Sequence, residues 1–169
     1  MSKPKPQITI VGLGMIGASM GLALRQAGVA SEVIGHDKDM GTANQARKLQ
    51  AVDRTDWNLI SACEKADLII LATPMGAIEP TLKAIAPYLH KGILVVLEST
   101  TYPGTTDEDL RAVLEKGSGL EAGKDFHLAF SPEREDPGNP ASKVAMIPKV
   151  VGGLTPACQE KACALYGKA

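Results

Sequence analysis

The sequence has few of the residues that build metal centres and covalent catalytic sites. Only three of its 169 residues are cysteine and three are histidine. No cysteines form a Cys-x-x-Cys pair, and the histidines are scattered, so we predict neither a metal site nor a catalytic cluster. An odd number of unpaired cysteines indicates reduced thiols and a cytoplasmic protein. The cysteines are Cys63, Cys158 and Cys163, and the histidines are His36, His90 and His127.

An excess of charge of either sign is also missing. Lysine and arginine number 18, aspartate and glutamate number 19, and the basic residues are spread along the chain. This balance argues against nucleic acid or an anionic membrane as the main partner. No apolar run reaches the length of a membrane span. Residues 1–6 lack the apolar core of a signal peptide, so we expect them to form a short flexible lead-in.

The chain does have the apolar content of a globular domain, with 44% hydrophobic residues. The β-branched run at residues 8–11 predicts a buried parallel strand, and residues 12–17 then read Gly-Leu-Gly-Met-Ile-Gly. A helical pattern follows over residues 18–27, and a second strand at residues 33–36 ends at Asp37. This acid lies 20 residues after the third glycine, where the dinucleotide-binding fingerprint has one.

Each residue of this turn has a predicted role in holding a pyrophosphate. Gly12 permits a tight turn with a positive φ, and Gly14 has no Cβ to keep the phosphates from the backbone. Gly17 lets the helix lie close to the strand. The amides that open the helix, with Met15 and Ile16, would bind the phosphates. The alternative is a glycine-rich turn that only packs a strand against a helix.

Asp37 and Lys38 bear on the choice of cofactor. The Asp37 carboxylate would accept hydrogen bonds from the adenosine ribose hydroxyls and repel a 2′-phosphate, which favours NAD. Lys38 beside it could tolerate that phosphate, which would admit NADP, or could be an ordinary surface lysine. We expect NAD, with NADP as the less favoured cofactor.

A third strand, predicted at residues 67–72, ends in Thr73 and Pro74. The carboxyl ends of parallel strands in a doubly wound sheet face the ligand crevice. Thr73 and Pro74 are therefore candidates for contact with the adenosine side of a cofactor. Their alternative role is to form a turn and start a helix at about Gly76.

A hydroxyl-rich loop follows the next predicted strand, residues 93–97. Ser99, Thr100 and Thr101 are ligand candidates, because this loop also lies at a strand's carboxyl end. Thr105 and Glu108 have the spacing of a capping box, which predicts a structural role for that threonine.

Strands that alternate with helices predict a single α/β domain over residues 7–169. We expect a doubly wound, mostly parallel sheet in three layers, the Rossmann architecture. Trp57, the only tryptophan, is expected to be a partly buried packing residue rather than a platform for a ligand. The remaining patterns predict helices at 38–50, 57–65, 107–116 and after Thr155, and strands at 126–130 and 149–151.

Two resemblances to known families divide the chain. Residues 7 to about 94 resemble the start of a prephenate or arogenate dehydrogenase, and from about Leu97 the chain resembles the nucleotide-binding domain of a UDP-sugar 6-dehydrogenase, especially of UDP-N-acetylhexosamine type. The first is carried by residues 10–19, 33–37 and 66–74, and the second by residues 98–106, 130–134 and 149–153. We therefore hypothesise a natural or engineered chimera with a join near residues 93–98.

The resemblances imply NAD or NADP as cofactor and a further helical domain, but they transfer no catalytic residue. Residues 131–134 stand where the prephenate family carries its catalytic histidine. Cys158 and Cys163 do not match the nucleophilic cysteine that the UDP-sugar family carries in a later domain. Thr100 resembles that family's threonine near the nicotinamide. Glu133 resembles an acid of its acid/base site, or is a solvated loop acid.

The first function hypothesis is a Rossmann domain that holds NAD without turning over a substrate, because the chain shows no second domain. The alternatives are a dehydrogenase completed by a homodimer partner and a folded scaffold with no ligand. The oligomeric state stays open between monomer and homodimer. The cofactor-binding candidates are Gly12, Gly14, Met15, Ile16, Gly17, Asp37, Lys38, Thr73, Pro74, Ser99, Thr100 and Glu133.

Overall fold

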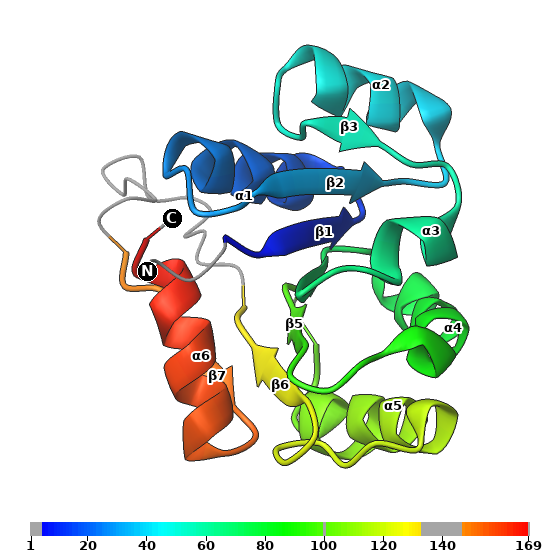
Figure 1. The fold of residues 1–169 in the computed structure, drawn as a ribbon, viewed down its shortest axis with the longest axis vertical. Helices are drawn as coiled ribbons and strands as arrows, with labels where there is room; N and C mark the ends of the chain where they lie inside the picture. Colours follow the sequence, from blue (N-terminus) through cyan, green and yellow to red (C-terminus); the bar gives the residue numbers. More distant parts are fainter. Residues whose placement is uncertain (1–4, 100, 133–146, 169) are drawn as a thin grey trace.

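A computed structural model describes residues 5–99, 101–132 and 147–168 of the chain. They form one seven-stranded sheet with helices on both faces (Figure 1). The predicted doubly wound, mostly parallel fold is confirmed. In chain order the elements are β1 (Gln7–Val11), α1 (Met15–Gln26), β2 (Glu32–His36), α2 (Met40–Lys48), β3 (Arg54–Thr55), α3 (Leu59–Cys63), β4 (Leu68–Leu71), α4 (Met75–Ile85), the 3-10 turn η1 (Ala86–Tyr88), β5 (Leu94–Leu97), the π-helical turn η2 (Thr105–Leu110), α5 (Arg111–Ser118), β6 (His127–Phe130), β7 (Gly152–Gly153) and α6 (Pro156–Tyr166).

The strand order β3-β2-β1-β4-β5-β6-β7 fixes where a ligand crevice lies. The chain starts at β1, winds outward to β3, and then returns past β1 to β4, so the direction of winding reverses between β1 and β4. Every neighbouring pair is parallel except β6 and β7. In such sheets the crevice opens beyond the carboxyl ends of the two strands at the reversal. Here those ends are the turn after Val11 and the turn after Leu71.

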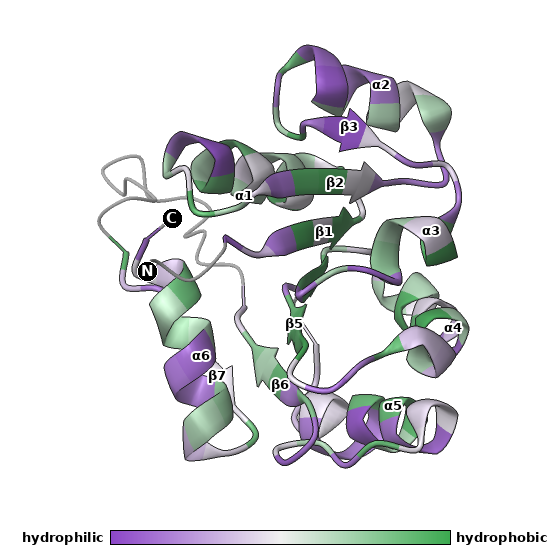
Figure 2. Ribbon diagram, viewed as in Figure 1, coloured by the Kyte–Doolittle hydropathy of each residue, from purple (hydrophilic) through white to green (hydrophobic). Residues whose placement is uncertain are grey.

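Two apolar layers, one on each face of the sheet, hold the fold together. Successive side chains of β4 alternate between the layers, so all four of its residues are buried. Burying a leucine or isoleucine side chain stabilises the folded state by about 1.5–3 kcal/mol, so β4 contributes to the stability of both layers. Helices α1, α2 and α6 contribute to one layer and α3, α4 and α5 to the other. In Figure 2 β5 and the middle of β2 are strongly hydrophobic, whereas the edge strand β3 is hydrophilic.

Three local predictions were wrong. The last strand is Gly152–Gly153, antiparallel to β6, and not residues 149–151. Thr105 does not cap a helix, because its hydroxyl instead donates to the Tyr102 carbonyl oxygen at 2.7 Å. Trp57 is not partly buried, because 83% of its surface is exposed.

The ends of the helices follow the predicted capping chemistry more closely. Thr155 accepts a hydrogen bond from Cys158 N at the start of α6, and Pro156 occupies the first helical position. Gly28 lies two residues after the end of α1 and has a φ of +60°, so the helix does not continue through it. None of the helices in the described ranges is long and apolar enough to cross a membrane.

Candidate cofactor-binding site

The turn after β1 needs glycine at position 12. Gly12 is buried with φ +92°, a conformation that residues with a Cβ rarely adopt. Its N–H donates to the His36 carbonyl oxygen at 2.9 Å, which ties the turn to the end of β2. A Cβ at this position would lie 2.4 Å from the Ala72 carbonyl oxygen, so the turns after β1 and β4 are in direct contact.

Gly17 sets how closely α1 approaches the sheet. A Cβ there would lie 1.9 Å from the Gly12 carbonyl oxygen and 3.2 Å from Cγ2 of Ile10. Both atoms belong to the strand and turn on which the helix packs. The absent side chain therefore allows the first turn of α1 to lie directly over the end of β1, as the fingerprint predicts.

Gly14 differs from the other two glycines because the protein itself does not require it. Its φ is −64°, which any residue adopts, and no heavy atom of the described residues lies within 4 Å of a Cβ added there. Gly14 is also the N-cap of α1, and no described side chain caps this helix. The amides of the first turn, including those of Met15 and Ile16, therefore face an open space that a Cβ would narrow. Such a space fits a pyrophosphate.

Asp37 links the end of β2 to the glycine turn. Its Oδ2 accepts a hydrogen bond from Leu13 N at 2.8 Å, and its Oδ1 accepts one from Asp39 N at 2.9 Å. A carboxylate has about four acceptor positions, so these two bonds orient the group and leave capacity for two sugar hydroxyls. Lys38, the next residue, is exposed.

Thr73 carries an unusual polar atom on the other side of the crevice. Its Oγ1 is buried and has no hydrogen-bond partner among the described residues. A buried hydroxyl without a partner is unfavourable by about 1–3 kcal/mol, so this atom favours a ligand or water as its partner. Its Cγ2 would lie 3.1 Å from a Cβ on Gly12, so the hydroxyl belongs to a side chain beside the glycine turn. Pro74 is exposed and is the N-cap of α4.

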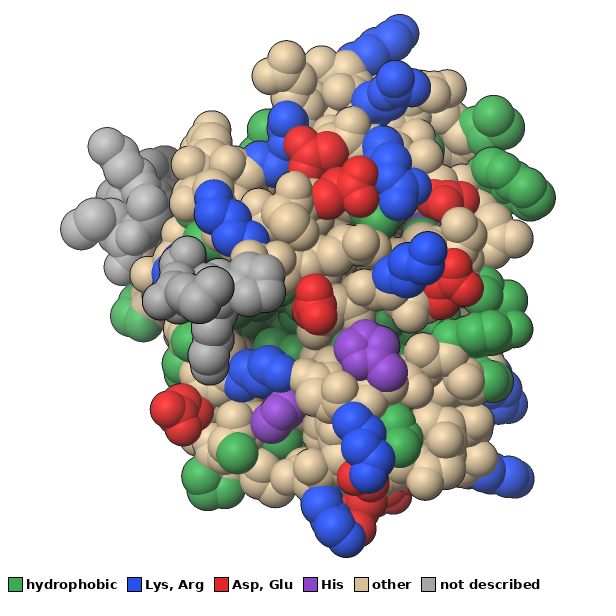
Figure 3. Space-filling view, in the orientation of Figure 1, with side chains coloured by type: hydrophobic (Ala, Val, Ile, Leu, Met, Phe, Trp, Pro, Cys, Tyr) green, Lys and Arg blue, Asp and Glu red, His purple; other side chains and the backbone are tan. Residues whose placement is uncertain are grey.

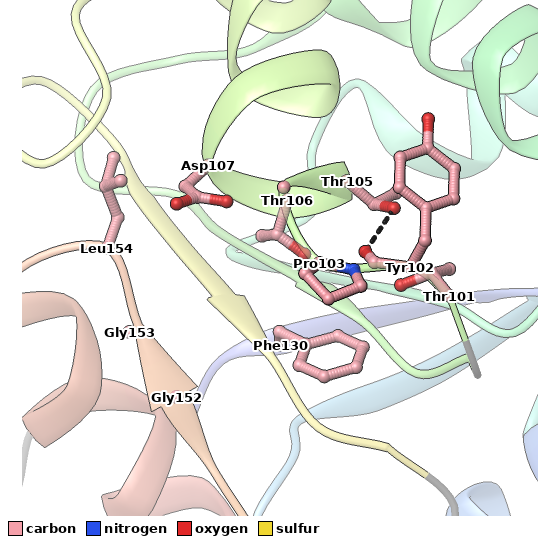
Figure 4. A pocket seen from close by; sticks show the side chains of 11 residues that line it. Thr101, Tyr102, Pro103, Thr105, Thr106, Asp107, Phe130, Gly152, Gly153 and Leu154 are labelled. Carbon is pink, nitrogen blue, oxygen red and sulfur yellow. Dashed lines mark hydrogen bonds between the residues drawn. The ribbon is translucent and has the colours of Figure 1, made fainter.

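The loop after β5 borders a separate cavity of about 410 Å³ (Figure 4). Thr101, Tyr102 and Pro103 line one side, and Phe130 with the β7 glycines lines the other. This cavity lies at the carboxyl ends of β5 and β6, on the same edge of the sheet as the glycine turn. Ser99 is half-buried at the start of this loop. The candidates Thr100 and Glu133 lie outside the described residues.

The most buried charged group of the described residues was not among the predicted site residues. Glu98 directly follows β5 and is only 2% exposed. Its Oε1 pairs with Nζ of Lys149, and its Oε2 accepts a hydrogen bond from the Tyr166 hydroxyl. Lys149 Nζ also donates to the Pro132 carbonyl oxygen at 3.0 Å and lies 5.5 Å from the centroid of the Tyr166 ring. We call Glu98, Lys149 and Tyr166 the buried ionic cluster.

This cluster joins segments that are far apart in the sequence. Burial and the charge of Glu98 raise the pKa of Tyr166, so its hydroxyl stays protonated and donates to the carboxylate. Through Glu98, Pro132 and α6, the cluster joins the segments that follow β5, β6 and β7. The sequence signal that could have found it is an acid placed directly after a wholly apolar strand.

The described cysteines and histidines differ in burial and in the direction of their pKa shifts. Burial, with a smaller contribution from Asp56, raises the pKa of Cys63 to about 12, so this thiol is protonated at neutral pH. Cys158 is also buried, whereas Cys163 is exposed. Burial and the nearby charge of Lys161 lower the pKa of His127. No group of three potential metal-ligating side chains occurs within the described ranges.

Several proteins of one enzyme class are similar over nearly the whole chain. UDP-N-acetyl-D-glucosamine 6-dehydrogenase from Pseudomonas aeruginosa is 33% identical over 95% of this chain and 43% of its own length. Protein CapL from Staphylococcus aureus is 34% identical over 88% of this chain and 39% of its own. The chain therefore spans about two fifths of the length of these relatives. The crystal structure of NDP-N-acetyl-D-galactosaminuronic acid dehydrogenase from Methanosarcina mazei superimposes with a TM-score of 0.81, at 25% identity, over 98% of this chain and 42% of the other.

The comparisons do not support a chimera. The first relative aligns over 95% of this chain, so one family accounts for the residues on both sides of 93–98. Prephenate dehydrogenase from Aquifex aeolicus covers 99% of this chain and 58% of its own, but with a TM-score of 0.71 and 18% identity, so it shows the shared fold alone.

A family model gives the assignment directly. Residues 50–169 match the NAD binding domain of the UDP-glucose/GDP-mannose dehydrogenase family, which is well over half of the chain. The expected cofactor, NAD, is the one that this match names, and the glycine turn with its neighbouring carboxylate fits a dinucleotide. This chain belongs to the UDP-glucose/GDP-mannose dehydrogenase family and is its NAD-binding domain.

Proposed function

We propose that the chain binds NAD with the pyrophosphate over the first turn of α1 and the adenosine ribose on Asp37. The observation that carries this proposal is the open space above Gly14, which no contact among the described residues fills. A helix start without a side-chain cap offers both unpaired amides and a positive dipole end to a phosphate. We assign the binding unit to residues 7–169, with residues 1–6 as a lead-in.

The carboxylate beside the turn supports NAD over NADP. Asp37 is oriented by the Leu13 and Asp39 amides, so it stands ready to accept from a ribose diol. A 2′-phosphate in the same place would meet this negative charge. Lys38 is exposed, and the Asp37 carboxylate remains the charged group beside the proposed ribose position.

The nicotinamide half of the cofactor would lie toward β4 and β5. Ser99 is the described candidate on this side. Thr73, with its buried hydroxyl, and Pro74 remain the proposed contacts on the adenosine side. Thr100 and Glu133 are proposed contacts from the family resemblance. The cavity beside the loop after β5 gives the reacting end of the cofactor and a substrate a place to meet.

We further propose that the chain serves the oxidation of a nucleotide-linked N-acetylhexosamine. Several relatives are named dehydrogenases of such sugars, and the chain spans 43% of the first of them. NAD, when bound, supplies the acceptor for a hydride. The described residues of this chain bind and orient that cofactor, and the protonated Cys63 thiol is not placed to act as a nucleophile. We therefore expect the chain alone to bind NAD without turnover.

Isothermal titration calorimetry with NAD and NADP tests the binding proposal. We expect the wild type to prefer NAD and Asp37→Ala to weaken NAD binding about tenfold to a hundredfold, because a charge-assisted contact is lost. Asp37→Asn is the matched control: it keeps an acceptor for the Leu13 amide but loses the charge, so it should narrow the preference for NAD. A folded wild type that binds no NAD at millimolar concentration would overturn the proposal.

A second experiment separates binding from turnover. The chain is mixed with NAD and either UDP-N-acetyl-D-glucosamine or UDP-N-acetyl-D-mannosamine, and NADH is followed by absorbance. We expect no NADH above a protein-free control. Sustained NADH formation at a rate proportional to protein concentration would support instead the alternative of a dehydrogenase completed by a second copy of the chain.

A further inference from the structure

The strand order predicts what lies beyond the adenosine ribose. In the proposed mode the pyrophosphate lies at the end of β1 and the ribose at the end of β2. The base of a nucleotide is attached to the far side of the sugar from its phosphates. The next strand in that direction is β3, and neighbouring strands are about 4.8 Å apart. The segment that follows β3 therefore lies where the adenine ring would be.

That segment carries Trp57, the only tryptophan of the chain. Its side chain is 83% exposed, the largest exposure among the large hydrophobic side chains of the described residues. The residue before it is bonded to the end of β2: Asp56 N donates to the Gly35 carbonyl oxygen at 2.9 Å, and the Asp56 carbonyl oxygen lies 3.0 Å from Nδ1 of His36. Trp57 therefore follows a residue that is bonded to the two positions just before Asp37.

The backbone on both sides of Trp57 is fixed, although its side chain is exposed. Asp56 accepts hydrogen bonds from Asn58 N at 2.9 Å and from the Ser61 hydroxyl at 2.8 Å. Burial acts to raise the pKa of Asp56, but these bonds and the charge of Arg54 outweigh it and lower the pKa. Asn58 in turn caps α3 by accepting from Ser61 N at 3.0 Å. An exposed indole on such a rigid segment is preorganised to receive a flat ligand.

Exposed apolar side chains recur along this edge of the molecule. Met15, Met40 and Met75 are each the first residue of a helix that follows a parallel strand, and each is more than half exposed. Apolar side chains protrude along the edge toward which β1 and β2 point (compare Figures 1 and 3). The crevice for the cofactor therefore has an apolar rim, and Trp57 is its largest and flattest member.

We propose that Trp57 is the platform on which the adenine ring of NAD stacks. This inference rests on the proposed function, because it takes the ribose position on Asp37 as its starting point. The indole offers a flat π-face to a purine, an interaction that any adenine nucleotide can make. Trp57 would thus contribute affinity for the adenosine half of the cofactor and none for the nicotinamide half.

The single tryptophan makes a direct test possible. Indole fluorescence of the wild type is followed during titration with NAD, with ADP-ribose, which lacks nicotinamide, and with nicotinamide mononucleotide, which lacks adenine. We expect saturable quenching of similar amplitude with NAD and ADP-ribose, and none with nicotinamide mononucleotide. If NAD binds by calorimetry but leaves the emission unchanged, the stacking proposal is wrong and the proposed function stands.

Affinity measurements give an independent readout. We expect Trp57→Ala to raise the Kd for NAD and for ADP-ribose about tenfold, within the range for loss of one aromatic stacking partner, and Trp57→Phe to keep most of the affinity. Tyr88→Ala is the matched control, because Tyr88 is also an exposed aromatic residue. It lies in η1, which follows the carboxyl end of α4, whereas the proposed cofactor site is at the amino end of that helix. An unchanged Kd for Trp57→Ala would overturn the platform, whereas a wild type that does not bind NAD would overturn the proposed function itself.

Discussion

Two regions at the carboxyl edge of the sheet are held together in different ways. At the β1–α1–β2 end, glycines bring backbone segments together, and the helix start above Gly14 is left open. At the β5–β6 end, the buried ionic cluster of Glu98, Lys149 and Tyr166 joins three segments through polar bonds within the protein. In the first region the amides at the start of α1 have no side-chain cap among the described residues. In the second region the polar groups of the cluster bond to one another. The first region is therefore suited to bind a ligand, whereas the second stabilises the contacts between segments of the protein.

The largest expected effect comes from breaking the cluster. Replacement Lys149→Met removes the ammonium group from a buried carboxylate, which typically lowers the free energy of unfolding by about 3–5 kcal/mol. Chemical denaturation followed by circular dichroism measures this change. The double variant Glu98→Gln, Lys149→Met should recover part of the loss, because the buried charge is gone. Wild-type stability in Lys149→Met would show that the pair does not hold this end together.

A smaller loss of stability is expected from Gly17→Ala at the other end. The new Cβ would overlap the Gly12 carbonyl oxygen, a backbone atom that cannot rotate away, so α1 must shift. Overpacking of this kind lowers the free energy of unfolding by about 1–3 kcal/mol. The same variant should also bind NAD more weakly, since the first turn of the helix moves. Native stability together with native affinity would contradict the close packing.

Gly14→Ala sharpens the comparison because it should separate binding from stability. The added methyl group meets no described heavy atom within 4 Å, so only the poorer N-cap preference of alanine applies, and the free energy of unfolding should fall by no more than about 1 kcal/mol. The methyl group does narrow the space proposed for the pyrophosphate. We expect the Kd for NAD, measured by calorimetry, to rise about tenfold or more. Unaltered affinity in this variant would mean that the phosphates lie elsewhere.

The smallest effect concerns Cys63, whose pKa is raised from its ordinary value of 9.0 to about 12. Above pH 9 the unfolded thiol loses its proton while the folded thiol keeps it, so the folded state binds more protons and stability falls as the pH rises. From pH 9 to pH 10 this one group should lower the free energy of unfolding by about 1 kcal/mol. Cys63→Ala should flatten the measured slope by that amount relative to the wild type. Identical slopes would show that the thiol is not shielded from water.

The glycine turn and Asp37 could be predicted from the sequence because their chemistry is local. A strand, a turn, a helix and a second strand follow one another, and each residue acts on its immediate neighbours in the chain or on the adjacent strand. The spacing of the fingerprint residues was therefore enough to predict the fold class and the conformation of the turn. The roles proposed for these residues toward NAD await the binding experiments.

The buried ionic cluster could not be predicted in the same way. Its members are separated by 51 and 68 residues, so no periodic pattern or spacing in the sequence brings them together. Lys149 was instead placed in a predicted strand, because its neighbours are β-branched. The exposure of Trp57 is not predictable for a related reason: a large aromatic residue near a short helix is usually at least partly buried, and only the structure shows that this one is exposed.

The two outermost strands have a consequence for self-association. Both β3 and β7 are only two residues long, and β3 carries the exposed charge of Arg54. Short, charged borders give another chain almost no ladder of backbone groups to pair with. Two copies of this domain would therefore meet through side chains of the flanking helices or loops, and growth of the sheet from one copy into the next is disfavoured.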